Sequence, residues 1–169
     1  MHVFSILRNK PALVGIGLAA ILAALPAGLA SAGTATTTFQ VTATVQATCL
    51  ISATDLAFGT YSGTQVDATS TITVTCTATT PWNIGLNAGL CPGGTVTTRC
   101  MQAGAATLNY AMYRDAARSL NWGNTVGTDT LSGTGSGSAQ NNTVYGRVAG
   151  SQYPAPGGYA DTITATVTF

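Results

Sequence analysis

Apolar and polar residues alternate along several short stretches of this 169-residue chain. The first is TTTFQVTATVQATC, residues 36–49, where every second position from Phe39 to Ala47 is apolar. The pattern returns in STITVTC, PWNIGLN, TLNYAMY and TVYGRV, at residues 70–76, 81–87, 107–113 and 143–148. A period of two is typical of a β-strand that buries one face. These stretches therefore predict strands.

The chain ends with another alternating stretch, YADTITATVTF, at residues 159–169. Its apolar face holds Tyr159, Ile163, Ala165, Val167 and Phe169, and threonines occupy the other face. Turns rich in glycine and proline separate the stretches, at residues 61–64, 91–94, 133–138 and 154–158. Short strands joined by such turns favour an all-β sandwich or barrel.

Two segments depart from this alternation. YRDAARSLNWG, residues 113–123, is compatible with one helical turn or with a loop. Residues 132–138 consist of glycine, serine and threonine, so we expect a flexible hairpin tip there.

The first 32 residues have the organisation of a secretory signal. Arg8 and Lys10 precede an apolar run at 11–29, and Ala30-Ser31-Ala32 matches a signal cleavage site. The alternative is a transmembrane anchor, but a proline and a glycine interrupt the run before the cleavage site. Removal of residues 1–32 from the 169 leaves 137, enough for one domain, and export permits disulfide bonds.

The exported part has little titratable chemistry. Glutamate is absent, and the only histidine and lysine, His2 and Lys10, lie in the signal. Four arginines and five aspartates remain, so nucleic acid binding lacks its basic patch. A Ser–His–Asp triad is excluded, and Asp55, Asp67 and Asp129 stand near turns, where aspartate commonly caps the backbone. We therefore predict a protein that is not an enzyme and needs no cofactor.

Four cysteines, Cys49, Cys76, Cys91 and Cys100, allow three disulfide pairings. We favour Cys49–Cys76, which joins two predicted strands, and Cys91–Cys100, which closes a local loop. A loop of the first size contributes about 3.5 kcal/mol in the chain-entropy model. A zinc site is disfavoured, since there is no CxxC pair and no histidine in the exported part.

The two tryptophans have two interpretations, as core residues or as part of a sugar-binding patch. Trp82 lies in an alternating stretch, which favours the core. Trp122 lies in a predicted loop, where both interpretations stay open.

The order of these blocks resembles the spore coat protein U family, which includes the pilin subunits of archaic chaperone–usher pili. The resemblance is carried by FQVTATVQATCLISATDLAFGTYSG, STITVTCT, LNYAMYRDAARSLNWGNTVGTDT, TVYGRV and PAPGGYADTITATVTF. It covers residues 36–169, and Cys49 and Cys76 stand where the family's first disulfide is expected.

The resemblance implies an incomplete immunoglobulin-like β-sandwich that lacks its final strand. In such proteins a periplasmic chaperone first fills the groove, and the N-terminal extension of the next subunit then replaces it. This exchange is β-augmentation, in which main-chain hydrogen bonds give affinity and alternate side chains fill pockets. The implied partners are other pilin subunits, the chaperone and an outer-membrane usher, and the implied destination is a cell-surface fimbrium or the extracellular space.

These implications divide the chain into a signal at 1–32, a donor-strand extension at 33–47 and a pilin domain at 48–169. Within the extension, residues 36–45 form the donor portion. The expected donor residues are Phe39, Val41, Ala43 and Val45. The expected groove residues, on the strand that also pairs with the chaperone, are Ile163, Ala165, Val167 and Phe169.

Three alternatives remain beside a fibre subunit that supports adhesion or biofilm formation. The N-terminal strand can pair within its own domain, which would complete a monomeric sandwich. The family name suggests a secreted spore-coat or matrix protein. A carbohydrate-binding tip adhesin is less favoured, because tip subunits generally carry a second domain and need no donor strand.

Overall fold

The computed structural model describes residues 32–169, so nearly all of the predicted signal lies outside the described residues. The chain divides into two units, Met1–Thr42 and Ala43–Phe169. All regular structure in the described part is β, as the sequence predicted. Within these residues no helix has the length and hydropathy to cross a membrane.

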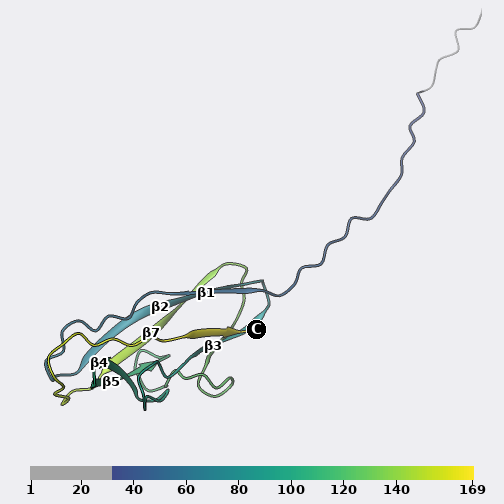
Figure 1. The fold of residues 1–169 in the computed structure, drawn as a ribbon. Coiled ribbons are helices and arrows are strands. Elements are labelled where there is room, and N and C mark those ends of the chain that lie inside the picture. The colour runs from purple at the N-terminus through teal and green to yellow at the C-terminus, as the bar shows by residue number, and fades with distance from the viewer. Residues whose placement is uncertain (1–31) are drawn as a thin grey trace, which may run out of the picture. The chain divides into compact units, whose positions relative to one another are not determined.

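Eight strands form two sheets (Figure 1). The larger sheet has the order β1-β2-β7-β5-β4, and the smaller has the order β6-β3-β8. The strands are β1 (Cys49–Ala53), β2 (Val66–Cys76), β3 (Pro81–Leu86), β4 (Arg99–Ala103), β5 (Ala106–Tyr113), β6 (Leu131–Thr134), β7 (Ala139–Val148) and β8 (Ala165–Thr168). All of the pairings between them are antiparallel.

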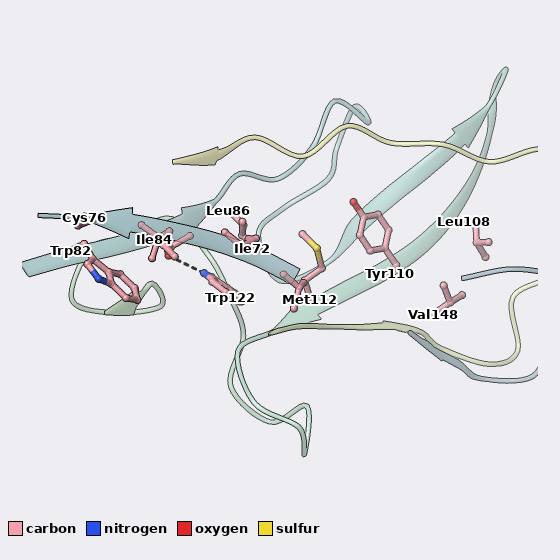
Figure 2. Packing of buried hydrophobic residues seen from close by; sticks show 12 residues of the cluster. Ile72, Cys76, Trp82, Ile84, Leu86, Leu108, Tyr110, Met112, Trp122 and Val148 are labelled. Carbon is pink, nitrogen blue, oxygen red and sulfur yellow. Dashed lines mark hydrogen bonds between the residues drawn. The ribbon is translucent and has the colours of Figure 1, made fainter. Parts of the chain in front are cut away.

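The alternating stretches bury their apolar faces between the two sheets. In β2, Ile72, Val74 and Cys76 are buried while the intervening threonines are partly exposed. The core gathers residues from both sheets and from one loop (Figure 2). It consists of Ile72, Val74, Cys76, Trp82, Ile84, Leu86, Leu108, Tyr110, Met112, Trp122, Val144 and Val148. The fold thus follows from the period-two pattern.

Trp122 belongs to the core although it lies outside the strands. Its side chain is fully buried, and its indole Nε1 donates a hydrogen bond to the carbonyl oxygen of Ile84 at 2.8 Å (Figure 2). Trp82 is 3% exposed. The core interpretation therefore holds for both tryptophans, and the sugar-patch interpretation is wrong.

The prediction of a hairpin tip at residues 132–138 is partly wrong, because β6 occupies its first half. β6 pairs with β3 in a register that places Gly133 opposite Trp82. A side chain at position 133 would collide with the Trp82 ring, so the glycine leaves room for the indole. A low-complexity segment can therefore form a strand when a large neighbour supplies the packing.

Two further expectations from the sequence are settled by side-chain contacts. Residues 114–123 form a loop after the end of β5, and the Asp115 carboxylate holds its backbone by accepting hydrogen bonds from the amides of Ser119 and Leu120. Asp67 does not cap a turn, since it lies within β2 and forms a bidentate ion pair with Arg147 on β7. Asp129 does act as a cap, accepting a hydrogen bond from the amide of Thr125.

The predicted N-terminal strand is not formed as a paired strand in this chain. Residues 32–47 are exposed and have no strand assignment, and regular structure begins at Cys49. None of their backbone groups is hydrogen-bonded to another described residue. A strand requires a partner strand for its ladder, so the strand predicted at residues 36–45 stays a prediction.

Candidate functional site

The site is an opening along the last strand of the smaller sheet. β8 pairs on one side with β3, in a register from Asn83↔Thr168 to Leu86↔Ala165. On its other side no strand is paired among residues 32–169. β1 is likewise an edge strand of the larger sheet and pairs only with β2. Two edges that belong to opposite sheets thus leave one side of the sandwich unclosed.

Two adjoining cavities form a groove between these edges, which we call the β8 groove. The first cavity, of about 450 Å³, lies between residues 53–56 and residues 159–165. The second, of about 680 Å³, lies between residues 56–63 and residues 152–159. Both are lined by Leu56, Phe58, Met101 and Tyr159, so the groove is continuous.

The floor of the groove is the hydrophobic core itself. In the first cavity it consists of Ile72, Leu86, Tyr110 and Val144, and in the second of Leu108 and Val148. All six are among the buried core residues. All six are at most 6% exposed, so the apolar surface that water reaches is that of the groove walls.

The walls of the groove carry inward apolar side chains that are only half-buried. On the first wall they are Leu56, Phe58 and Tyr61. On the second wall they are Tyr159, Ile163 and Ala165, alternating with exposed residues. These side chains pack against the core on one side only. The arrangement lacks the side chains of about one strand.

Of the four predicted groove residues, Ile163 and Ala165 line the first cavity, whereas Val167 and Phe169 line neither cavity. Ala165 and Val167 are in β8, and Ile163 continues the same face before the strand begins. Phe169 follows the strand and is 56% exposed. The sequence analysis missed Leu56 and Phe58 on the facing wall. Their own alternation in the segment DLAFG is the signal that would have found them.

Asp161 is the one inward position of the second wall that carries a charge. Its carboxylate accepts hydrogen bonds from the Tyr110 hydroxyl at 2.7 Å and from the Leu90 amide at 2.8 Å. Burial, together with the Asp161 contact, raises the pKa of Tyr110, so this phenol stays protonated and acts as the donor. Asp161 therefore places a polar contact in an otherwise apolar wall.

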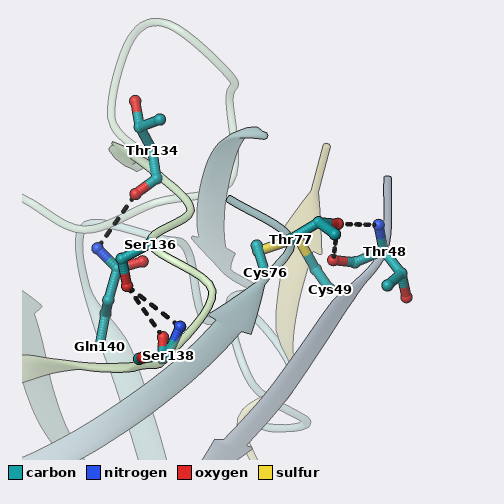
Figure 3. Close-up of a disulfide and its surroundings, with 8 residues drawn as sticks. All are labelled: Thr48, Cys49, Cys76, Thr77, Thr134, Ser136, Ser138 and Gln140. Atoms are coloured by element: carbon teal, nitrogen blue, oxygen red, sulfur yellow. Dashed lines mark hydrogen bonds between the residues drawn. A yellow bond between two sulfur atoms is a disulfide. The ribbon is translucent and has the colours of Figure 1, made fainter. Parts of the chain in front are cut away.

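The disulfides are Cys49–Cys76 and Cys91–Cys100, the two pairs favoured from the sequence. The first joins the opening residue of β1 to the last residue of β2. Beside it, the Thr48 amide donates a hydrogen bond to the Thr77 hydroxyl, and this hydroxyl donates to the Thr48 carbonyl (Figure 3). The domain is thus fastened at the point where the N-terminal extension ends.

The second disulfide closes a loop that Arg99 fixes to the core. The Arg99 guanidinium is fully buried and donates to backbone carbonyls of Leu86, Asn87, Val96 and Trp122. Burial lowers the pKa of this guanidinium, and the four carbonyls replace the water that it has lost. The same loop contributes the Leu90 amide to Asp161, so it also supports the groove wall.

Tyr61 holds the opposite end of the groove. Its hydroxyl donates to the carbonyl of Ala149 at 2.9 Å and accepts from the Gln152 amide at 3.0 Å. This ties the first wall to the loop that leads into the second wall. The groove is therefore framed at both ends by hydrogen bonds to the backbone.

The predicted donor residues are exposed. Phe39, Val41 and Val45 are 84%, 85% and 81% exposed, and Ala43 is exposed as well. Large apolar side chains at such exposure gain nothing from burial in the described structure.

The all-β fold with an open groove agrees with what the comparisons with known proteins show. The family model for the Spore Coat Protein U domain matches residues 35–166, and the chain belongs to that family. Protein U of Myxococcus xanthus is 37% identical over 178 residues, covering 95% of this chain and 98% of that protein. The resemblance stated from the sequence is therefore confirmed.

A solved structure gives the fold an experimental counterpart. The chain matches the crystal structure of the CsuC–CsuE chaperone–tip adhesion subunit pre-assembly complex from the archaic chaperone–usher Csu pili of Acinetobacter baumannii. The TM-score is 0.56 and the identity 28%, and the match covers 75% of this chain. This chain spans 40% of the length of the matched chain. Family and fold support a structural role like that of pilus subunits rather than an enzymatic one.

Proposed function

We propose that this protein is a structural subunit of an extracellular chaperone–usher fibre and polymerises by donor-strand exchange. The β8 groove of one copy would receive residues 36–45 of the next. The observation that carries the proposal is the pair of half-buried apolar walls around a groove floored by the core. The exposed apolar face of Phe39, Val41, Ala43 and Val45 has the period needed to fill it.

The energetics favour such an insertion. Burying a large apolar side chain gains about 1.5–3 kcal/mol, and each ladder hydrogen bond adds about 1 kcal/mol. The free edge of β8 offers backbone groups for that ladder. The same free edge, with the half-buried apolar side chains of the walls, would make an empty subunit prone to aggregation, which is the reason to expect a periplasmic chaperone.

The geometry of the groove favours a donor strand antiparallel to β8. The walls run in opposite directions, because residues 53–56 face 159–165 and residues 56–63 face 152–159. The start of β1 and the C-terminus therefore lie at the same end of the domain (Figure 1). An antiparallel donor enters at that end and leaves at the Tyr61 end, so the next domain sits away from the acceptor's own extension. A parallel donor would place the next domain and the acceptor's own extension at the same end of the acceptor.

The partners of this function are a second copy or a related subunit, a periplasmic chaperone and an outer-membrane usher. Head-to-tail contacts that do not close into a ring produce a filament. Export through the periplasm to the cell surface follows from the predicted signal at residues 1–32. Adhesion or biofilm formation would be the role of the assembled fibre.

Deletion of residues 33–45 tests the donor assignment. The truncated subunit should still form a soluble one-to-one complex with the chaperone, because its groove is intact. It should form no fibre as the sole subunit, as judged by electron microscopy and by loss of denaturant-resistant polymers. Fibres from the truncated protein alone would show that residues 33–45 are not the donor.

A matched pair of substitutions removes the objection that a deletion shortens the chain. Val41→Asp places a charge on the inward face of the donor, whereas Thr42→Asp places it on the outward face. Val41→Asp should abolish polymerisation and Thr42→Asp should permit it. Equal effects of the two substitutions would contradict insertion into an apolar groove.

A second candidate is a secreted coat or matrix protein that does not form a pilus. It is favoured by the 37% identity to Protein U along nearly the full length of both chains. Co-expression with a periplasmic chaperone discriminates the two. A coat protein that folds alone should be soluble without the chaperone, whereas a pilin should be soluble only with it.

A further inference from the structure

The groove carries one feature that sets the position of an inserted strand, and this inference rests on the proposed function. Side chains on the second wall alternate inward from Tyr159 to Val167, and they differ in size and polarity. Ala165 is the smallest and Asp161 is the only charged one. An antiparallel donor strand places each inward residue directly opposite one inward residue of this wall. A register shift of two residues, or of a multiple of two, keeps the donor's apolar face inward, whereas a shift of one residue turns that face outward.

A bulky donor side chain is unfavourable opposite Asp161. The Asp161 carboxylate already accepts hydrogen bonds from the Tyr110 hydroxyl and from the amides of Leu90 and Thr162. A large apolar side chain pressed against it would remove its remaining contact with water without offering a hydrogen bond. A small side chain avoids that cost. Asp55, on the facing wall of the cavity, is exposed.

The donor has one small residue among its four inward positions and one very large residue. Phe39 precedes Ala43 by four residues, and Asp161 precedes Ala165 by four residues. In an antiparallel pair, one register therefore places the small donor residue opposite the charged position and the large donor residue opposite the smallest wall residue. It places Phe39 opposite Ala165 and Ala43 opposite Asp161. A shift of two residues in either direction puts Val41 or Val45 against the carboxylate.

We propose that Ala43 of the donor lies opposite Asp161 and Phe39 opposite Ala165, with the Tyr110–Asp161 pair acting as the register mark of the groove. Val41 then lies opposite Ile163, and Val45 lies opposite Tyr159. The whole donor portion, 36–45, then pairs with residues 159–168.

Engineered cysteines test the register in fibres of the full-length protein. Ile163→Cys is combined in turn with Phe39→Cys, Val41→Cys or Ala43→Cys, so that only the donor cysteine moves. Facing residues bring their Cβ atoms within about 4.5–5.5 Å, whereas diagonal neighbours are about 7–8 Å apart, beyond disulfide reach. Val41→Cys should give a ladder of covalent multimers on non-reducing gels, at least about tenfold stronger than the others. The single variant Ile163→Cys is the control.

The outcomes separate the register from the proposed function. A stronger ladder with Phe39→Cys or Ala43→Cys, or fibres without a ladder in any variant, would overturn the register and leave donor-strand exchange standing. Failure of the unsubstituted protein to polymerise with its chaperone and usher would overturn the proposed function itself.

A second pair of variants keeps the test decisive if the cysteine variants assemble poorly. Ala43→Leu enlarges the residue that faces Asp161, and Val45→Leu enlarges the residue that faces Tyr159. Fibre yield should fall about tenfold more for Ala43→Leu, the equivalent of 1.4 kcal/mol. A greater loss for Val45→Leu would mean that Val45 lies at the polar position and the register is shifted.

Discussion

The two flanks of β3 show a closed and an open version of the same sandwich. Each flank carries a four-residue strand, β6 on one side and β8 on the other. On the β6 side the core is closed by Trp82, which is 3% exposed, and by Trp122, which is fully buried. On the β8 side the inward residues Ala165 and Val167 remain half-buried beside the groove.

The two flanks differ in the side chains that fill the space between the sheets. On the closed flank, two indole rings reach across the space that a longer strand would fill, and Gly133 makes room for one of them. On the open flank the wall residues have no such neighbours, and two cavities remain. Since interiors are normally packed without voids, the open flank is a place for an additional chain. Each prediction below changes one flank and measures whether the two respond differently.

The largest effect is expected on the closed flank, from Trp122→Ala. The substitution removes a fully buried side chain and the hydrogen bond to Ile84. We expect the free energy of unfolding to fall by about 3–5 kcal/mol, measured by urea denaturation. The exposed Leu50 on the outer face of β1 is the control, and Leu50→Ala should change stability by less than about 0.5 kcal/mol. Equal effects would mean that Trp122 does not close the core.

A smaller loss is expected from Arg99→Leu, at the loop that joins the closed flank to the groove. The substitution leaves four carbonyls without their donor. Because an unsatisfied buried acceptor costs about 1–3 kcal/mol and some of the four will relax toward water, we expect a loss of about 3 kcal/mol. Arg99→Lys keeps the charge with fewer donors, so its unfolding midpoint should lie between those of the native protein and Arg99→Leu. A neutral result for Arg99→Leu would contradict a structural role for these hydrogen bonds.

On the open flank, Ile163→Ala should have two different effects. In the subunit with an empty groove the side chain is half-buried, so its loss should cost only about 1 kcal/mol. With a peptide of residues 36–45 bound, the same side chain would be fully covered, and the loss should rise to about 2–4 kcal/mol. Thermal unfolding with and without the peptide measures both values. The variant Thr166→Ala, at an exposed position of β8 that lines neither cavity, should show no such rise; a rise of the same size there would contradict the groove assignment.

The sequence predicted the closed part of the fold better than the open part. β2, β3, β5 and β7 were all expected from their alternation, because each buries one face in its own domain. β4 and β6 were missed, since Arg99–Ala103 has no alternation and Leu131–Thr134 is rich in small residues. Their strand character depends on neighbours, such as Trp82 beside Gly133, that are brought together only by folding.

The groove could be predicted on one wall and not on the other. Ile163, Ala165 and Val167 stood out because their alternation continues to the C-terminus. The role of Asp161 could not be read from the sequence, because its partners Tyr110 and Leu90 are 51 and 71 residues away. The role of a polar residue within an apolar face depends on contacts with residues that are far away in the sequence.

The smallest effect is expected outside both flanks, at the ion pair on the outer face of the larger sheet. The hydrogen bond from Arg147 and the nearby charge of Arg118 hold the pKa of Asp67 below its ordinary value of 3.8. A depressed pKa in the folded state means that the pair stabilises the protein above that ordinary value, and that this contribution is lost as the pH falls below it. Asp67→Asn should therefore cost less than about 1 kcal/mol near pH 7, and this cost should shrink as the pH falls below 3.8, as measured by urea denaturation over that range.

The matched control for this pair is Asp55→Asn, because Asp55 is exposed and has no hydrogen-bond partner among the described residues. It should leave the free energy of unfolding near pH 7 unchanged, because no hydrogen bond is lost. Both variants should leave polymerisation unchanged, since Asp67 lies on the outer face and Asp55 faces water at the rim of the groove. A loss of fibres in Asp67→Asn would place a subunit contact on the outer sheet face, and the open flank would then not be the only surface through which the copies meet.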